Sequence, residues 1–590
     1  MPLPDPLALK EHFPPVSTKA WRNRMQRDLG SMDPARSVEW ITPDGFAIDP
    51  VCRSDDTAAI ASAAGRSGPW HFRQDISAGC VVTANKEAHA ALEQGATAIG
   101  FIAPQNRPTF TRRDFADLLD GIALDVTPVY WEGFAEPSRV VAGLIAVAHA
   151  HALPRASLEG AIGCDPAGRL ARTGALDAKV AYDELGELVG AAEHSQLQTV
   201  CMDARSYHMA GATCAQELGC LLGAASEAFV QLIERGFPAE LVVRHMLFSI
   251  PVTPSYLMAI SKVRALHHVA RQLFAAFGVT EGLPVINAVT SFRSYSLLDP
   301  PSNLLRATIQ AMTAIMGGCR TFTVQPHDRS SDAQRLARNL QLILRHEAHL
   351  GIVADPAAGS YYVETLTDKV ARAAWAFFQE LEERGGLLEA LKVGFVQRAI
   401  RKARQARFEE LATGRRILVG VNTLPTTLTT EDLRMDALCA QTGGRPAATS
   451  GASHEVEPLP CERDAERFEA LRLRTEALRQ TVGRRLRVQV LDSMSQSDAE
   501  QLFGWAGFKI ETRADSACPD VLVASSTSAA DMPEMPGMDE LAPQLVLVGP
   551  SALKEQALRV TRFFIPDDGD MLLAVSVLQD ALAARLQRTP

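Results

Sequence analysis

Apolar and polar positions between residues 302 and 386 follow two different periods. The first apolar set recurs at the spacing of one helix face, and Gly317-Gly318 ends it. A short β-rich run, Thr321–Gln325, follows and ends in polar residues. After a second helical face comes another short apolar run, Gly351–Ala354, and then a turn at Asp355–Ser360. The pattern predicts two successive strand-and-helix units of an α/β domain.

The same alternation extends over residues 46–412, where eight strand-like runs each precede an apolar segment of helical period. Eight such units favour a closed (β/α)8 TIM barrel over an open sheet. The predicted strands are Ala96–Ala103, Leu124–Tyr130, Ser157–Ile162, Thr199–Asp203, His245–Ile250, Val285–Val289, Thr321–Gln325 and Gly351–Ala354.

The segments on either side of the predicted barrel differ from it in composition. Residues 1–45 are first proline-rich and then charged, and we interpret them as an N-terminal arm that ends in a short helix. Residues 413–484 have linker composition followed by a connecting helix. Residues 485–590 predict a small, doubly wound, flavodoxin-like domain. Its predicted strands are Arg487–Leu491, Phe508–Glu511, Val521–Ser525, Leu545–Val548 and Phe563–Ile565.

Composition and charge exclude several classes of protein. The 590 residues are 47% hydrophobic and 22% charged, with a net charge of −10, which disfavours a nucleic-acid surface. No apolar run is long enough to cross a membrane and the first residues do not resemble a signal peptide, so we expect a cytoplasmic protein with no membrane partner. The ten cysteines show no CxxC spacing and are expected to be reduced. The basic helix face Arg401–Arg407 is expected to be solvated.

Several strings in the barrel region resemble the adenosylcobalamin-dependent acyl-CoA mutases, specifically the methylmalonyl-CoA mutase family. They occur in the family's order and span about half of the chain. The family's fold is a TIM barrel followed by a cobalamin-binding domain, so the resemblance implies the same barrel as the strand count. The strings are KVRALHHVARQLFAAFG, DPPSNLLRATIQAMTAIMGG, ARNLQLIL, DPAAGSYYVETLT and GVNTLP.

The barrel region departs from the catalytic members of this family where they handle substrate. Those members carry a GYHMQEAGA-type strand end, whose histidine hydrogen-bonds the thioester carbonyl. This chain has DARSYHMAGA, so either Ser206 takes the histidine's place or the loop around His208 is shortened. The tyrosine that stacks near the radical is absent from the matching segment, Ala64–Gln74. The resemblance therefore implies no catalytic residue, and leaves as vestigial pocket candidates Arg205, Ser206, Tyr207, His208, Arg293 and Gln325.

The C-terminal domain departs from a cobalamin site in a similar way. Catalytic members place a histidine on cobalt from a DxHxxG loop, and a carboxylate tunes that histidine. In the matching loop of this chain a methionine replaces the histidine and a serine replaces the glycine, and the last histidine of the chain is His454, in the linker. We therefore expect this chain to bind no cofactor and no metal. The degenerate positions are Asp492, Met494, Ser497, Ser525 and Gly549.

These departures resemble the small (beta), non-catalytic subunits of heterodimeric methylmalonyl-CoA mutases. The resemblance implies a large catalytic partner that holds adenosylcobalamin, handles the acyl-CoA and interconverts methylmalonyl-CoA and succinyl-CoA in propionate metabolism. In that family the N-terminal arm wraps the partner. One alternative is an active mutase with another acyl substrate and a non-histidine cobalamin ligand such as Met494. Another is a stand-alone scaffold or chaperone-binding protein.

Overall fold

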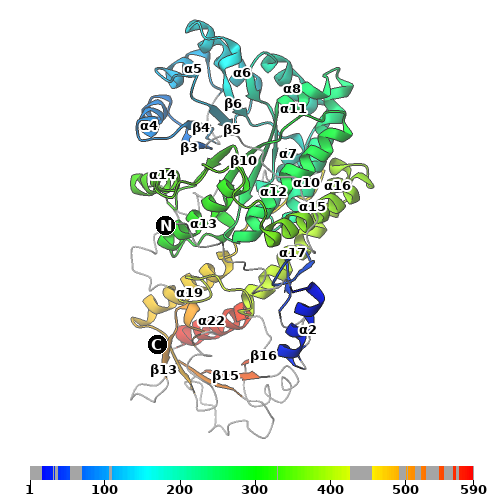
Figure 1. Ribbon diagram of the computed structural model, residues 1–590. Helices are drawn as coiled ribbons and strands as arrows, with labels where there is room; N and C mark the ends of the chain where they lie inside the picture. The colour runs from blue at the N-terminus through cyan, green and yellow to red at the C-terminus, as the bar shows by residue number, and fades with distance from the viewer. Residues whose placement is uncertain are drawn as a thin grey trace, which may run out of the picture.

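The computed structural model describes residues 16–30, 32, 38–53, 70–104, 109–328, 330–425, 455–490, 500, 503–511, 520–525, 544–549, 563–566 and 571–588. In Figure 1 the barrel occupies the upper part of the molecule and the C-terminal domain the lower part. Helices α17 (Phe395–Ala412) and α19 (Glu466–Val482) lie between them.

Nine parallel strands form the barrel. Their order is β7-β6-β5-β4-β3-β11-β10-β9-β8, and every neighbouring pair is parallel. The end strands β7 and β8 are consecutive in the chain and separated only by Thr199, so one interrupted strand closes the ring at its eighth position. The strands are β3 (His71–Ser77), β4 (Ala98–Ile102), β5 (Val129–Glu132), β6 (Glu159–Ile162), β7 (Gln196–Gln198), β8 (Val200–Asp203), β9 (Met246–Val252), β10 (Val285–Thr290) and β11 (Thr321–Thr323).

The predicted α/β class and TIM barrel are confirmed, but one strand was misplaced. Residues 351–354 form a turn rather than a strand, with Ile352 78% and Val353 57% exposed. The strand that the sequence analysis missed is β3, whose HFRQDIS sequence places polar side chains toward the axis. A search for apolar runs does not find such a strand, because its inward positions carry charge rather than aliphatic groups.

Within the part of the chain that the structure describes, eight helices surround the barrel, each following a strand. They are α4 (Val81–Glu93), α5 (Arg112–Leu119), α6 (Pro137–Ala150), α8 (Ala178–Ala192), α10 (Cys214–Glu234), α12 (Tyr256–Ala276), α13 (Pro300–Gly317) and α14 (Ser331–His346). A further long helix, α15 (Tyr361–Glu382), packs across α10 and α12. Short helices α7 (Pro166–Thr173) and α9 (Arg205–Met209) follow β6 and β8, and a 3-10 turn, η3 (Phe292–Ser294), follows β10. These three segments lie at the carboxyl ends of the strands, where active sites of this fold are built.

Alternation along the strands separates the barrel core from the bore. On β9, Met246, Phe248 and Ile250 pack outward into the main hydrophobic core beneath the helices. Leu247, between them, belongs to a separate cluster with residues of β4, β5, β6 and β8. Successive strand residues point to opposite faces of a sheet, so this second cluster lies inside the barrel.

The C-terminal domain contains a five-stranded parallel sheet of order β13-β12-β14-β15-β16. This is the flavodoxin-like order, in which the second strand lies outside the first, and it agrees with the predicted doubly wound fold. Its core includes the end of α17 together with α19 and α22 (Met571–Arg588). The strands are β12 (Arg487–Val490), β13 (Lys509–Glu511), β14 (Val521–Ser525), β15 (Gln544–Gly549) and β16 (Phe563–Pro566).

The N-terminal arm contributes helix α2 (Thr18–Leu29) and a hairpin of β1 (Trp40–Ile41) and β2 (Ala47–Ile48). Ser17 caps α2 by accepting a hydrogen bond from the backbone N–H of Ala20. No residue of this fully described helix is buried.

Candidate functional site at the barrel mouth

Side chains fill the lower part of the bore. The hydroxyl of Tyr130, on β5, reaches Thr321, on β11, with 2.8 Å between the two oxygens. β4 and β3 lie between these two strands in the ring, so this hydrogen bond spans the interior. The rest of the buried layer consists of Ala98, Ala161, Cys201 and Leu247.

A chain of ion pairs fills the bore above this layer. Arg73, only 2% exposed, extends from β3 over the ring of Tyr130. Its guanidinium donates to Oδ1 of Asp75 and to Oε1 of Glu132, both at 2.6 Å. The opposite oxygen of Glu132 lies 2.7 Å from Nη1 of Arg205, at the start of α9. Two arginines and the carboxylates between them thus join β3, β5 and the β8 end across the mouth.

Neighbouring groups complete this network. Nε of Arg205 donates to Oδ2 of Asp203 at 2.8 Å, and the amide of Gln325 donates to Oδ2 of Asp75 at 3.2 Å. Gly100, on β4, lies against the Arg73–Asp75 pair, and a Cβ at that position would overlap both side chains. A small hollow of about 50 Å³ next to Arg73 and Asp75 is lined on its other side by Gln334 and Arg338 of α14, so it lies between the barrel wall and that helix.

The arginine and carboxylate side chains of this network neutralise one another. Burial favours the neutral form of Glu132, but Arg205 and Arg73 outweigh it and lower the pKa of that carboxyl to about 2. Burial also favours neutral Arg73, yet Asp75 and Glu132 raise the pKa of its guanidinium. Burial raises the pKa of Asp75, despite the opposing charge of Arg73. Both guanidiniums are therefore held by carboxylates of the same chain.

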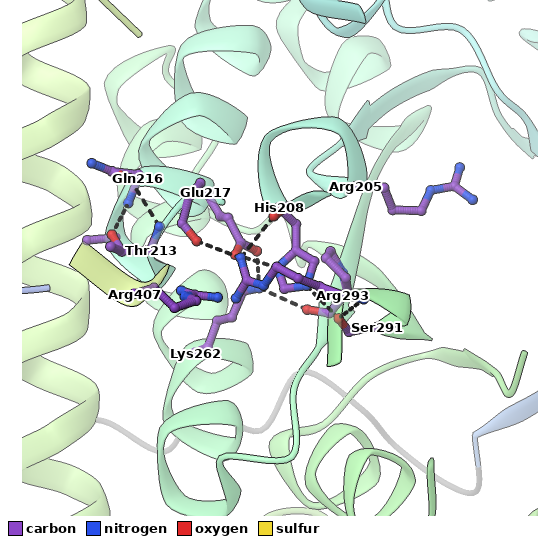
Figure 2. Close-up of polar contacts among 12 residues, drawn as sticks. Arg205, His208, Thr213, Gln216, Glu217, Lys262, Ser291, Arg293 and Arg407 are labelled. Atoms are coloured by element: carbon purple, nitrogen blue, oxygen red, sulfur yellow. Dashed lines mark hydrogen bonds and ion pairs between the residues drawn. The ribbon is translucent and has the colours of Figure 1, made fainter. Parts of the chain in front are cut away.

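A second polar cluster lies behind the mouth, in the core. His208, on α9, is fully buried, with Nδ1 2.7 Å from Oε1 of Glu217 and Nε2 2.6 Å from Oγ of Ser291. Lys262, on α12, donates to the other oxygen of Glu217 and to the carbonyl of Pro251. Figure 2 shows these residues converging from α9, α10, α12 and the turn that follows β10.

The protonation state of this cluster follows from its contacts. Burial, reinforced by the charge of Arg293, lowers the pKa of His208 to about 3 even though Glu217 opposes the shift. Burial would raise the pKa of Glu217, but His208 and Lys262 outweigh it and lower that pKa to about 2. The imidazole is thus neutral, with Nδ1–H donating to Glu217 and the hydroxyl of Ser291 donating to Nε2.

The order of groups Glu217, His208, Ser291 is that of a nucleophile-activating relay. Such a relay requires a nucleophile that substrate can reach. Ser291 is 1% exposed, and its Oγ also accepts the backbone N–H of Arg293 at 3.2 Å. The guanidinium of Arg293 donates to the carbonyls of His208 and Ala212 at 2.9 and 3.0 Å. The arrangement fastens α9 to β10 and does not present a reactive hydroxyl.

The structure separates the six pocket candidates into three pairs. Arg205 and Gln325 belong to the mouth network, and Arg205 points away from the buried cluster (Figure 2). His208 and Arg293 belong to the buried cluster. Tyr207 and Ser206 lie on α9, where the tyrosine is fully buried and the serine is half-buried.

Sequence analysis missed four residues that organise these clusters. Glu217 and Lys262 could have been found from the sequence, because a charged residue within an apolar helix predicts a buried partner of opposite charge. Charges at alternate positions of HFRQDIS could likewise have indicated a polar bore. The four are Arg73, Glu132, Glu217 and Lys262.

The structure describes only part of the predicted cofactor region. Asp492, Met494 and Ser497 lie outside the described residues. Ser525 and Gly549 end the neighbouring parallel strands β14 and β15, at the edge where ligands of doubly wound sheets bind. Within the described ranges, no group of three or more histidine, cysteine or acidic residues could hold a metal ion. Nor does any helix in those ranges have the length and apolar character of a membrane span.

The donor set does not fit a histidine-ligated cobalamin. None of the 14 histidines of the chain lies after His454, so no residue from 455 to 590 can offer an imidazole to cobalt. A hollow with a volume of about 410 Å³ lies between α12 and α15. It lies on the outer surface and is lined in part by His268, Asp368 and Trp375.

The family match and the matches to curated relatives agree with one another. Residues 109–453 match the methylmalonyl-CoA mutase family. A methylmalonyl-CoA mutase small subunit from Streptomyces virginiae is 30% identical over 82% of this chain and 80% of its own length. One from Porphyromonas gingivalis is 28% identical over 85% and 84%. A methylmalonyl-CoA mutase from Rhizobium meliloti is 25% identical over 68% and 63%. Among solved structures, a dihydropteroate synthase from Coxiella burnetii covers 53% of this chain and 100% of its own, at 11% identity and a TM-score of 0.27.

Proposed function

The chain belongs to the methylmalonyl-CoA mutase family, and we propose that it is the small, non-catalytic subunit of a heterodimeric mutase. In this proposal a large subunit binds adenosylcobalamin and interconverts methylmalonyl-CoA and succinyl-CoA, and this chain supports it in the cytoplasm. The match to proteins named as small subunits supports the assignment, because it extends over 80% or more of their own lengths.

The filled bore is the observation that carries the proposal. A barrel that works on an acyl-CoA at its mouth needs room there for the thioester and its reacting groups. Here Arg73 bridges β3 to Glu132 on β5, and Glu132 in turn contacts Arg205 after β8, so side chains occupy the mouth. Removing one partner of a buried ion pair costs about 3–5 kcal/mol. A substrate would have to separate Arg73 from Asp75 and Glu132 at a comparable cost before any chemistry began.

The state of His208 supports the same proposal. Its two ring nitrogens are engaged by Glu217 and Ser291, and its side chain is fully buried. A catalytic acid or base must come within hydrogen-bond reach of the substrate. An imidazole in this position serves instead to join α9, α10 and β10.

The composition of the C-terminal domain supports the absence of cobalamin from this chain. Residues 455–590 contain no histidine, and the thioether of Met494 is a weaker donor than the imidazole it replaces. We therefore assign adenosylcobalamin to the large subunit. The parallel sheet of this domain keeps the fold of a cobalamin-binding-like unit without the family's lower axial ligand.

Helix α2 supports a partner for the N-terminal arm. A 12-residue helix is marginally stable in water by itself, and no residue of this one is buried within the chain. Trp21 and Met25 are half-buried on α2. Packing of this arm on the large subunit, as in the family that the chain resembles, would supply the missing contacts.

An absorbance titration of the isolated chain with adenosylcobalamin tests the proposal. We expect no shift of the lower axial ligand band and no saturable binding. We also expect the chain to elute with the large subunit as one heterodimer in size-exclusion chromatography. Saturable binding with a spectral shift would mean that this domain has a ligand other than histidine, and would overturn the proposal.

A further inference from the structure

The segment 455–466, which we name the strap, connects the linker region to α19 along one side of the barrel mouth. Its backbone donates hydrogen bonds to carbonyls of the loops and helices that follow β6, β8 and β10. The first lies between Glu455 and Gly174 at 2.8 Å, and the last between Asp464 and Arg293 at 2.8 Å. Val456 and Leu459 are 5% and 6% exposed and belong to the barrel core. The strap is thus seated on the barrel along its whole length.

The strap is acidic, and the face of α17 beside it is basic. Arg401 lies 2.6 Å from Glu457, Arg404 lies 3.3 Å from Glu462, and Arg407 lies 4.0 Å from Asp464. The three arginines are three residues apart and therefore share one helix face. The expectation that Arg401–Arg407 is a solvated face holds at Arg401 but is wrong toward Arg407, because an acidic segment about 60 residues further along the chain covers that end.

These ion pairs become more buried toward the C-terminal domain. The side chains of the first pair are 51% and 63% exposed, those of the second 27% and 39%, and those of the third 11% and 20%. Just beyond the third pair, Arg463 joins Glu469 at 2.7 Å, and both side chains are at least 93% buried. The inner end of the ladder is therefore protected from solvent, while its outer end is open to screening by salt.

The strap leads directly into the element that docks the C-terminal domain. Glu469, on α19, accepts hydrogen bonds from Ser296 Oγ at 3.0 Å and from the N–H of Leu297 at 2.6 Å, both in the loop before α13. The end of α17 shares a hydrophobic core with α19 and α22. Figure 1 shows α17 and α19 between the barrel and the C-terminal domain. The position of that domain is therefore set where the strap ends.

We propose that the strap and the basic face of α17 form a charge-dependent clasp that holds the C-terminal domain in one position over the barrel mouth. Each exposed pair by itself is weak and is screened by salt. Pairs in series along one helix act together, because the backbone bonds of the strap hold each acid opposite its arginine. The clasp restricts motion between the two domains of this chain, whatever the chain binds.

Hydrogen exchange on the full chain tests the clasp. The variant Arg401→Glu/Arg404→Glu reverses the two outer arginines and leaves Arg407, which adjoins Arg293, in place. We expect the amides of Glu455, Val456, Leu459 and Glu462 to exchange at least tenfold faster, with barrel amides unchanged. The compensating exchange Glu457→Arg/Glu462→Arg, added to that variant, should restore protection. In the unmodified chain, salt raised from about 0.05 to 1 M should accelerate the same amides.

A matched control separates pairing from a general effect of charge. Arg398→Glu/Lys402→Glu reverses two charges on the same helix, and the described residues pair neither of them with an acid. This control should leave exchange in the strap unchanged. Unchanged exchange in the Arg401→Glu/Arg404→Glu variant would overturn the proposal. So would an equal effect of the control, or a failure of the compensating exchange to restore protection.

Discussion

Replacement of Lys262 by methionine tests the account of the buried cluster most sharply. Lys262 is 2% exposed, and its ammonium donates to Oε2 of Glu217 and, at 2.8 Å, to the carbonyl of Pro251. Methionine fills a similar volume but removes the charge. Glu217, 1% exposed, then remains buried with only the imidazole N–H of His208 as a donor, and the Pro251 carbonyl loses its hydrogen bond.

The expected loss follows from these contacts. Leaving one partner of a buried ion pair uncompensated costs about 3–5 kcal/mol. We therefore expect Lys262→Met to lower the free energy of unfolding of the barrel by that amount. Glu217→Gln combined with Lys262→Met removes both charges. The double variant should be more stable than the sum of the two single losses predicts, with a coupling energy of about 1–3 kcal/mol.

Urea denaturation followed by circular dichroism at pH 7.5 measures both quantities. Lys86→Met is the control, because Lys86 is an exposed residue of α4, and its replacement should change stability by less than ~0.5 kcal/mol. A loss below about 1 kcal/mol in Lys262→Met, or strictly additive losses in the double variant, would mean that Lys262 and Glu217 are not coupled as a buried ion pair.

Three further predictions concern the mouth and two buried titratable groups. Gly100→Ala places a methyl group against Arg73 and Asp75 and should cost about 1–3 kcal/mol in thermal denaturation, whereas Gly79→Ala, with its nearest neighbour at 3.6 Å, should cost little. Folding lowers the pKa of His208 from 6.5 to about 3, so the unfolded chain binds one more proton between these pH values. The free energy of unfolding should therefore fall as the pH drops from 6.5 toward 3. His208→Gln should weaken this dependence in urea midpoints measured at several pH values. Burial raises the pKa of Asp165 from 3.8 to about 6, so the folded chain binds one more proton between these pH values. The free energy of unfolding should therefore fall as the pH rises from 3.8 to 6. Asp165→Asn, which keeps the N-cap of α7, should weaken this dependence in the same urea measurements.

Much of the fold could be predicted because apolar strands alternate with apolar helix faces. The same rule failed at β3, where Arg73 and Asp75 point inward, and at Gly351–Ala354, where an apolar run forms an exposed turn. The local spacing of apolar and polar residues shows which side of a segment faces a hydrophobic core. It cannot show that the interior of a barrel is charged, because the charges that make this possible come from other strands.

The candidate site was predictable only in part for the same reason. The resemblance drew attention to His208 and Arg205, but it could not show that one points into the core and the other into the mouth. That division depends on Glu217 and Glu132, which are 9 and 73 residues away along the chain and whose roles arise only in the folded barrel. The basic face of α17 likewise has a partner that lies beyond the linker.

A turnover assay measures whether this chain has catalytic activity of its own. Purified chain, purified large subunit and their mixture would each be incubated with methylmalonyl-CoA and adenosylcobalamin, and succinyl-CoA would be measured. The account predicts no product from this chain alone, and activity in the mixture that depends on the large subunit. Formation of succinyl-CoA by the isolated chain would contradict this proposal. It would mean that Arg73, Asp75 and Glu132 do not fill the barrel mouth while substrate is bound.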